Sequence, residues 1–86
     1  MAITVKKPSE NEIRQMQACP VWSCQPSEFN WFYSDTETCL ITRGRARLSY
    51  DGGAVDIAPG DLVVLPKGLS CVWSVAEPIC KHYRFE

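Results

Sequence analysis

Two residues capable of chemistry, Glu37 and Cys71, stand in stretches that are otherwise apolar and aromatic. A carboxyl group in such surroundings can act as a general acid or base. A thiol can act as a nucleophile when a neighbouring base or cation lowers its pKa. No histidine stands near Cys71 in the sequence. The sequence therefore favours a buried space-filling side chain or a ligand contact at this position over a nucleophile.

Catalysis at Glu37 has a structural alternative. The carboxylate can line the interior of the fold as an acid–base group. It can also end a strand in an ion pair with Arg45 or Arg47, or in a hydrogen bond with a tyrosine. Charged networks of the second kind are common without any catalytic role. We expect the carboxylate to point inward, and the sequence leaves its chemical role open.

Three aromatic residues, Trp31, Tyr33 and Trp73, have two possible roles of their own. Aromatic side chains dominate the cores of small proteins, and they also line pockets that hold small organic ligands. Both roles are compatible in a β-barrel, whose interior is partly core and partly pocket.

Charge and composition exclude several classes of partner. The chain has 86 residues, with nine basic and ten acidic side chains and no basic stripe, which argues against nucleic acid and anionic membranes. No apolar run reaches the roughly 20 residues that span a bilayer, and residues 1–7 lack the apolar core of a signal peptide. Five cysteines, an odd number with no C-x-x-C pair, indicate free thiols. We therefore expect a cytoplasmic protein in a reducing compartment.

The N-terminal part predicts one strand and one helix. Residues 3–6 alternate apolar and polar side chains, as a short strand does. Ser9 and Glu12 have the spacing of a capping box, and Met16 belongs to the apolar face of the helix that follows. Pro20 ends this segment, because proline cannot continue a helix.

The remainder predicts short strands separated by Gly and Pro turns about every ten residues, which is typical of a sandwich or barrel. The expected strands cover residues 21–24, 29–33, 36–42, 45–50, 54–58, 62–65, 71–75 and 79–85. The fold class predicted is all-β, a single domain over residues 1–86. Within it, residues 1–20 form the N-terminal strand and helix and residues 21–86 form the barrel.

Two stretches resemble the paired motifs of the cupin superfamily. Gly60, Pro66 and Gly68 have the spacing glycine, five residues, proline, one residue, glycine, and Glu37 is followed after six residues by Gly44. More narrowly, the chain is similar to small single-domain cupins of the Cupin-3 group, to modules of ureidoglycine aminohydrolase and to ethanolamine-utilisation cupins. Further stretches that carry this resemblance are residues 29–33, 37–39, 69–73 and 81–83. The resemblance implies a cupin jelly-roll barrel.

In metal-binding members of the superfamily, the first motif supplies two histidines and a glutamate, and the second motif supplies a third histidine. The resemblance puts the glutamate at Glu37 and the third histidine position at Cys71. The first two positions fall on the pair Trp31 and Tyr33 or on the pair 30 and 32, and neither pair offers an imidazole. We therefore expect no cofactor and no metal site of the usual kind.

A loosely held divalent metal is left open, because Glu37, Cys71 and His82 are acceptable zinc ligands. Strand alternation argues against this set, since it places His82 on the face opposite to Lys81 and Tyr83, which belong to the inward set.

Three classes of function follow. The first is a binding protein whose pocket for a small organic molecule is lined by Trp31, Tyr33, Glu37, Cys71 and Trp73. The second is an enzyme acting on a small nitrogen compound or sugar derivative, with Glu37 as the acid–base group and Cys71 as a ligand or nucleophile. The third is a non-catalytic structural or interaction module whose barrel is closed by the three aromatic residues. A homodimer is expected, because so short a chain has a thin core.

Overall fold

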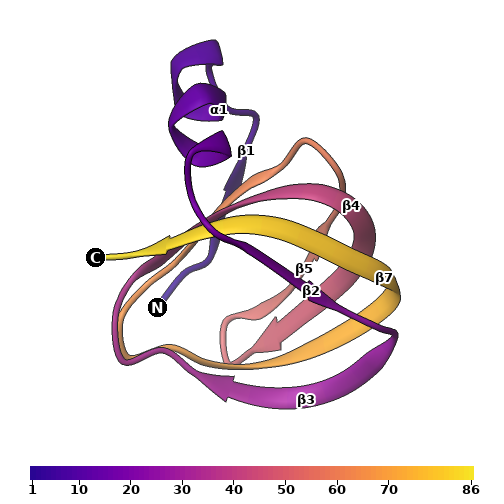
Figure 1. Cartoon of the computed structure of the whole chain (residues 1–86). Helices are drawn as coiled ribbons and strands as arrows, with labels where there is room; N and C mark the ends of the chain where they lie inside the picture. Colours follow the sequence, from indigo (N-terminus) through magenta and orange to yellow (C-terminus); the bar gives the residue numbers. More distant parts are fainter.

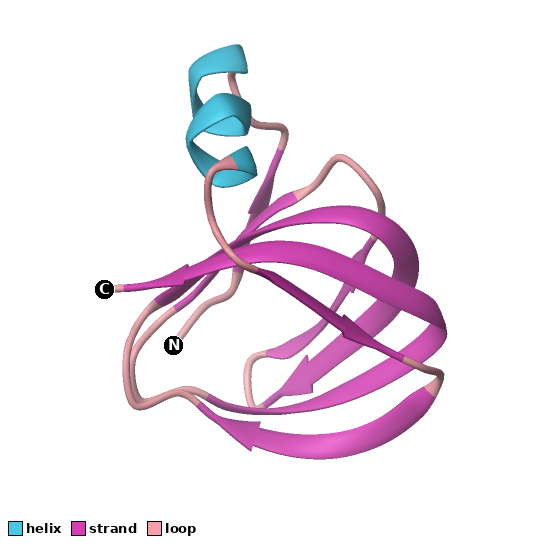
Figure 2. Cartoon of the chain, in the orientation of Figure 1, coloured by secondary structure: helices cyan, strands magenta, loops and turns pink.

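The computed structural model describes all 86 residues and has one helix and seven strands. In chain order these are β1 (Thr4–Lys6), α1 (Glu10–Gln17), β2 (Val21–Cys24), β3 (Ser27–Phe32), β4 (Glu37–Tyr50), β5 (Gly53–Ile57), β6 (Leu62–Leu65) and β7 (Ser70–Phe85). Figure 1 labels them, and Figure 2 shows how little of the chain is helical. The predicted all-β fold with one short helix is confirmed.

All strands belong to one antiparallel sheet with the order β1-β6-β4-β7-β2. The long strands β4 and β7 form its centre, with β3 paired to the first half of β7 and β5 to the second half of β4. Both long strands bend strongly, so that the sheet curls around its own interior (Figure 1). Side chains from both halves of the sheet therefore converge inside.

The sequence prediction divided each of the two long strands, and this was wrong. Residues 36–42 and 45–50 are one strand, as are residues 71–75 and 79–85. The pairing continues through register shifts around Gly44, and such bulges let a strand bend without ending. Gly44 has φ +83°, and a Cβ at this position would lie 2.1 Å from the carbonyl oxygen of Pro78. Gly44, which the sequence pattern assigned to a turn between two strands, therefore lies at the bend of one continuous strand.

The core has two parts, one inside the curled sheet and one outside. Fourteen buried residues form the interior cluster, among them Leu48, Val63 and Leu65. On the outer face, Met16 of α1 packs with Leu40 and Leu62. Strand β6 is thus covered on both faces, as its continuous apolar sequence predicts. Burial of a methionine side chain contributes about 1.5–3 kcal/mol, so this contact holds the helix on the sheet.

The helix begins as predicted. The Ser9 hydroxyl accepts a hydrogen bond from the Glu12 backbone N–H at 3.2 Å, and the Ser9 N–H donates to Glu12 Oε1 at 2.9 Å. These reciprocal bonds form the capping box. At eight residues, this helix is too short to cross a membrane.

We expect Gly44→Ala to destabilise the protein by more than Gly60→Ala. Both glycines have positive φ, but a Cβ at residue 60 would meet no atom closer than 3.9 Å. Gly60→Ala therefore bears only the backbone cost, about 1 kcal/mol, whereas Gly44→Ala adds a backbone clash. Urea unfolding of the two variants measures the difference. Equal losses would contradict the close approach of β4 and β7 at this bend.

Candidate ligand-binding site

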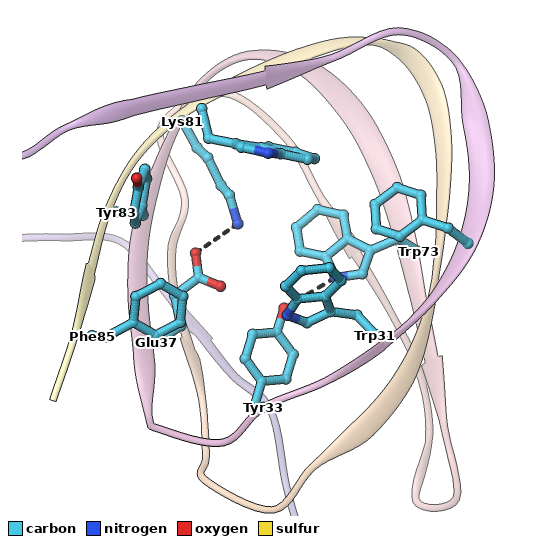
Figure 3. Close-up of a pocket in the computed structure, with 9 residues that line it drawn as sticks. Trp31, Tyr33, Glu37, Trp73, Lys81, Tyr83 and Phe85 are labelled. Carbon is cyan, nitrogen blue, oxygen red and sulfur yellow. Dashed lines mark hydrogen bonds and ion pairs between the residues drawn. The ribbon is translucent and has the colours of Figure 1, made fainter.

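The interior of the curled sheet contains a pocket of about 190 Å³. Seven of its nine lining residues are hydrophobic, and Glu37 and Lys81 are the exceptions. The complete lining is Trp22, Phe29, Trp31, Tyr33, Glu37, Trp73, Lys81, Tyr83 and Phe85, shown in Figure 3. All three tryptophans of the chain are among them. The pocket is therefore an aromatic chamber with one acidic and one basic side chain.

Strand alternation brings these side chains together. Successive residues of a strand point to opposite faces, so Lys81, Tyr83 and Phe85 of β7 share the inner face. The same rule places Phe29 and Trp31 of β3 on that face. It also distinguishes the two pairs considered for the first two histidine positions of metal-binding cupins. Trp31 and Tyr33 face the pocket, whereas residues 30 and 32 do not.

Glu37 and Lys81 form a buried ion pair at the wall of the pocket. Lys81 Nζ lies 2.6 Å from Glu37 Oε2, and the two side chains are 6% and 4% exposed. A hydrogen bond between two ionised groups is short and strong. Each charge is expensive to bury alone, so the pair holds its two strands in register.

Two indole rings flank the buried ammonium group. Lys81 Nζ lies 5.0 Å from the ring centroid of Trp22 and 4.6 Å from that of Trp73. Both distances are within the range of a cation–π interaction, which strengthens when the cation is desolvated. The ammonium group is thus stabilised by one carboxylate and two aromatic faces in place of water.

The Trp73 ring is fixed by its own contacts. Its Nε1 donates a hydrogen bond to the Tyr33 hydroxyl at 3.0 Å. Its ring stacks on that of Phe29, with 6.1 Å between the ring centroids and 4° between the ring planes. The same ring packs edge-on against Trp22. Burial, together with the Glu37 charge, raises the pKa of Tyr33 far above its ordinary value. The hydroxyl therefore stays protonated at neutral pH and keeps its role in positioning Trp73.

One oxygen of the Glu37 carboxylate makes no hydrogen bond. Oε2 accepts from Lys81, whereas Oε1 accepts no hydrogen bond from the protein. Figure 3 shows this second oxygen turned toward the open middle of the pocket. Trp31 lies at the rim, where it is 51% exposed. A ligand that enters past Trp31 thus meets an unpartnered acceptor.

Four of the five predicted site residues, Trp31, Tyr33, Glu37 and Trp73, line this pocket, and Cys71 does not. Cys71 is buried and faces inward as expected, but it borders a second surface depression on the other side of Trp31. Burial raises the pKa of its thiol, although the nearby Lys81 charge acts against this. That direction is opposite to the one a nucleophilic thiol requires.

The structural alternative for Glu37 named Arg45 or Arg47 as an ion-pair partner, and neither of them pairs with it. Arg45 pairs with Glu77 at 3.6 Å and Arg47 with Asp56 at 2.8 Å, and both pairs are exposed. These arginines alternate with residues of the core, so their side chains point away from the interior. The true partner, Lys81, was missed, even though alternation had already grouped it with the inward Tyr83.

The residues present do not fit the metal site of the fold family. No group of three or more His, Cys, Asp and Glu side chains could hold a metal ion. His82 lies outside the pocket, with Nδ1 3.1 Å from the carbonyl oxygen of Cys19. The carboxylate of Glu37 already has a cation beside it, the Lys81 ammonium group. That the purified protein carries no metal stays a prediction for elemental analysis.

Comparisons with known proteins agree with this fold. A family model described as a EutQ-like cupin domain matches residues 12–83. The crystal structure of a DUF861 family protein from Thermotoga maritima is 36% identical, with a TM-score of 0.93 over 99% of this chain and 100% of that one. The Clostridium difficile EutQ structure is 23% identical, with a TM-score of 0.70 over 76% of this chain and 52% of that one. No curated protein matches the chain.

We expect Lys81→Met to destabilise the protein by about 3–5 kcal/mol, because it leaves the Glu37 charge buried without a partner. The double variant Glu37→Leu/Lys81→Met removes both charges and should recover most of that loss. Arg45→Met is the matched control, since its ion pair is exposed and contributes about 0–1 kcal/mol. Chemical unfolding checks all three. A double variant no more stable than Lys81→Met would contradict the coupling between the two residues.

The stability should also fall in alkali. Burial raises the pKa of the Cys39 thiol from 9.0 to about 12. Between these values the unfolded chain loses this proton and the folded chain keeps it, so the free energy of unfolding decreases as the pH rises. Each group of this kind contributes up to about 1.4 kcal/mol per pH unit.

The measurement is the slope of the unfolding free energy against pH above 9.0. Cys39→Ala should make this slope less steep, because Cys71 and Tyr33 still contribute to it, whereas Cys24→Ala, at a partly exposed thiol, should leave it unchanged. An unchanged slope in Cys39→Ala would show that this thiol is not the group responsible.

Proposed function

The chain belongs to the EutQ-like cupin family, and we propose that it binds a small organic molecule in the aromatic pocket of its barrel. The observation that carries this proposal is the open pocket itself. A largely apolar cavity with a few converging polar groups is the usual form of a small-molecule site. Here the polar groups are Glu37 and Lys81, and the apolar walls are the surrounding aromatic rings.

The size of the pocket limits its ligand. A volume of about 190 Å³ corresponds to about six water molecules at roughly 30 Å³ each. Pockets for drug-sized ligands are larger, about 300–1,000 Å³. Stacked and edge-on rings along the walls favour a flat ligand, because aromatic groups pack best in these arrangements. The pocket therefore suits a compact, planar molecule of about one ring.

The walls do not close the space. Tyr33 and Trp73 are 1% and 2% exposed and belong to the core, while Trp31 stands at the rim. A structural module whose barrel is filled by these three side chains would leave no such pocket. This supports a binding role over the structural alternative.

The expected homodimer stays a prediction, which sedimentation of the purified protein tests.

A second candidate is an enzyme acting on a small nitrogen compound or sugar derivative, with Glu37 as the acid–base group. The unpartnered oxygen of Glu37 favours it, because a general base must reach the proton that it accepts. A structural neighbour from Salmonella typhimurium, 18% identical, is described as a putative ethanolamine utilization protein, and this supports a nitrogen compound as the substrate. A compound altered by the parent and left intact by Glu37→Gln would support this candidate. Turnover unchanged in a folded Glu37→Gln would remove it.

Binding can be followed by the chain's own fluorescence, since all three tryptophans line the pocket. We expect at least one single-ring compound to change tryptophan emission saturably and to raise the melting temperature. Trp31→Ala should weaken that binding about two- to tenfold, the range of one aromatic contact.

Phe32→Ala is the control for the rim. Phe32 is the next residue of β3, is 61% exposed and does not line this pocket. The Phe32→Ala variant should therefore bind the same compound as tightly as the parent protein does. A set of single-ring compounds with no saturable response would contradict the proposal, as would an equal loss in Trp31→Ala and Phe32→Ala.

A further inference from the structure

We infer that the pocket selects uncharged ligands that donate a hydrogen bond, and that Glu37 Oε1 is the atom that accepts it. This inference rests on the proposed function and names the chemical class of its ligand. It follows from two observations, the charge balance of the pocket and a carboxylate oxygen in it without a hydrogen-bond partner.

The first observation is that the two charges of the pocket cancel. Glu37 and Lys81 are its only ionisable residues besides Tyr33 and Tyr83, and they compensate each other at 2.6 Å. A tyrosine hydroxyl is uncharged at neutral pH, and burial raises the pKa of Tyr33 still further. A charged ligand would enter an apolar space in which no counter-charge is left for it, and burial of an unpaired charge is costly. An anion would also approach the Glu37 carboxylate, and a cation would approach the Lys81 ammonium group.

The second observation concerns hydrogen bonding. A carboxylate only accepts hydrogen bonds, and Lys81 satisfies one of the two oxygens of Glu37. Water can satisfy the other oxygen while the pocket is open. A ligand that displaces this water without offering a donor leaves the oxygen unsatisfied, which weakens binding by about tenfold.

The Lys81 ammonium group already has partners within the protein. Its hydrogen bond goes to Glu37, and the indole rings of Trp22 and Trp73 flank it at 5.0 and 4.6 Å. The geometry therefore assigns recognition to one acceptor on Glu37 and to the flat aromatic walls. A planar ring carrying an uncharged N–H or O–H donor, such as a primary carboxamide, meets both requirements.

Four probes of similar size separate charge from hydrogen bonding. Benzamide is neutral and a donor, methyl benzoate is neutral and lacks a donor, benzoate is an anion, and benzylamine is a cation at neutral pH. Titrations by tryptophan fluorescence give their dissociation constants. We expect benzamide to bind about tenfold more tightly than each of the other three.

Benzoate or benzylamine binding as tightly as benzamide would overturn the preference for uncharged ligands. Methyl benzoate binding as tightly as benzamide would overturn the requirement for a donor. Saturable binding with the wrong order thus rejects this inference and leaves the proposed function standing. No saturable response to any of the four overturns both, because the selectivity rests on the pocket being a ligand site.

Variants identify the accepting atom. Glu37→Leu/Lys81→Met removes the acceptor together with its counter-charge and leaves no buried charge unpaired. In this double variant, benzamide should lose its preference over methyl benzoate, with the ratio of their dissociation constants falling to about one. Arg45→Met/Glu77→Leu, which removes an exposed ion pair of the same two strands, should keep the parent ratio. A parent-like ratio in the first variant would show that Glu37 is not the acceptor.

Discussion

Two opposite charges that leave water together, Glu37 of β4 and Lys81 of β7, constrain the interior of this barrel. Neither could be buried alone at an acceptable cost, so their ion pair requires the register in which Ile41 of β4 lies opposite Lys81. From that position the long lysine side chain reaches along the inner face to Glu37 (Figure 3). The central strand pair and the site therefore depend on the same contact.

The aromatic layer follows from this pair. An ammonium group removed from water needs more than one carboxylate around it, and the faces of Trp22 and Trp73 supply the remaining stabilisation. The orientation of Trp73 depends in turn on its hydrogen bond to Tyr33 and its stacking on Phe29. The tryptophan side chains that pack in the core therefore also stabilise the buried charge of Lys81. This is how a small barrel combines a stable interior with an open pocket.

Local patterns predicted much of this structure. The capping box at Ser9 and Glu12 spans only four residues of sequence, and it forms as expected. Alternation correctly assigned the inward faces, including the direction of Glu37 and the outward direction of His82. The spacing from Gly60 to Gly68 indicated the cupin family, which the family match over residues 12–83 confirms.

Long-range pairing could not be predicted in the same way. Glu37 and Lys81 are 44 residues apart, and their contact depends on a register that shifts at the bulges around Gly44. Lysine is also among the residues least often buried, so Arg45 and Arg47, closer in sequence, were the more natural partners to expect. The sequence suggested nearby residues of the right charge, whereas the structure pairs Glu37 with a distant lysine on the same inner face.

Because the cation beside Glu37 is a side chain, the electrostatic character of the pocket is inherited with the polypeptide. The ion pair can form as soon as β4 and β7 pair, because both of its charges belong to these two strands. The positive charge beside Glu37 is covalently part of the chain, so it cannot dissociate as a bound ion can. In this respect Lys81 supplies from within the polypeptide a positive charge that a bound ion would have to bring from solution, and a single codon encodes it.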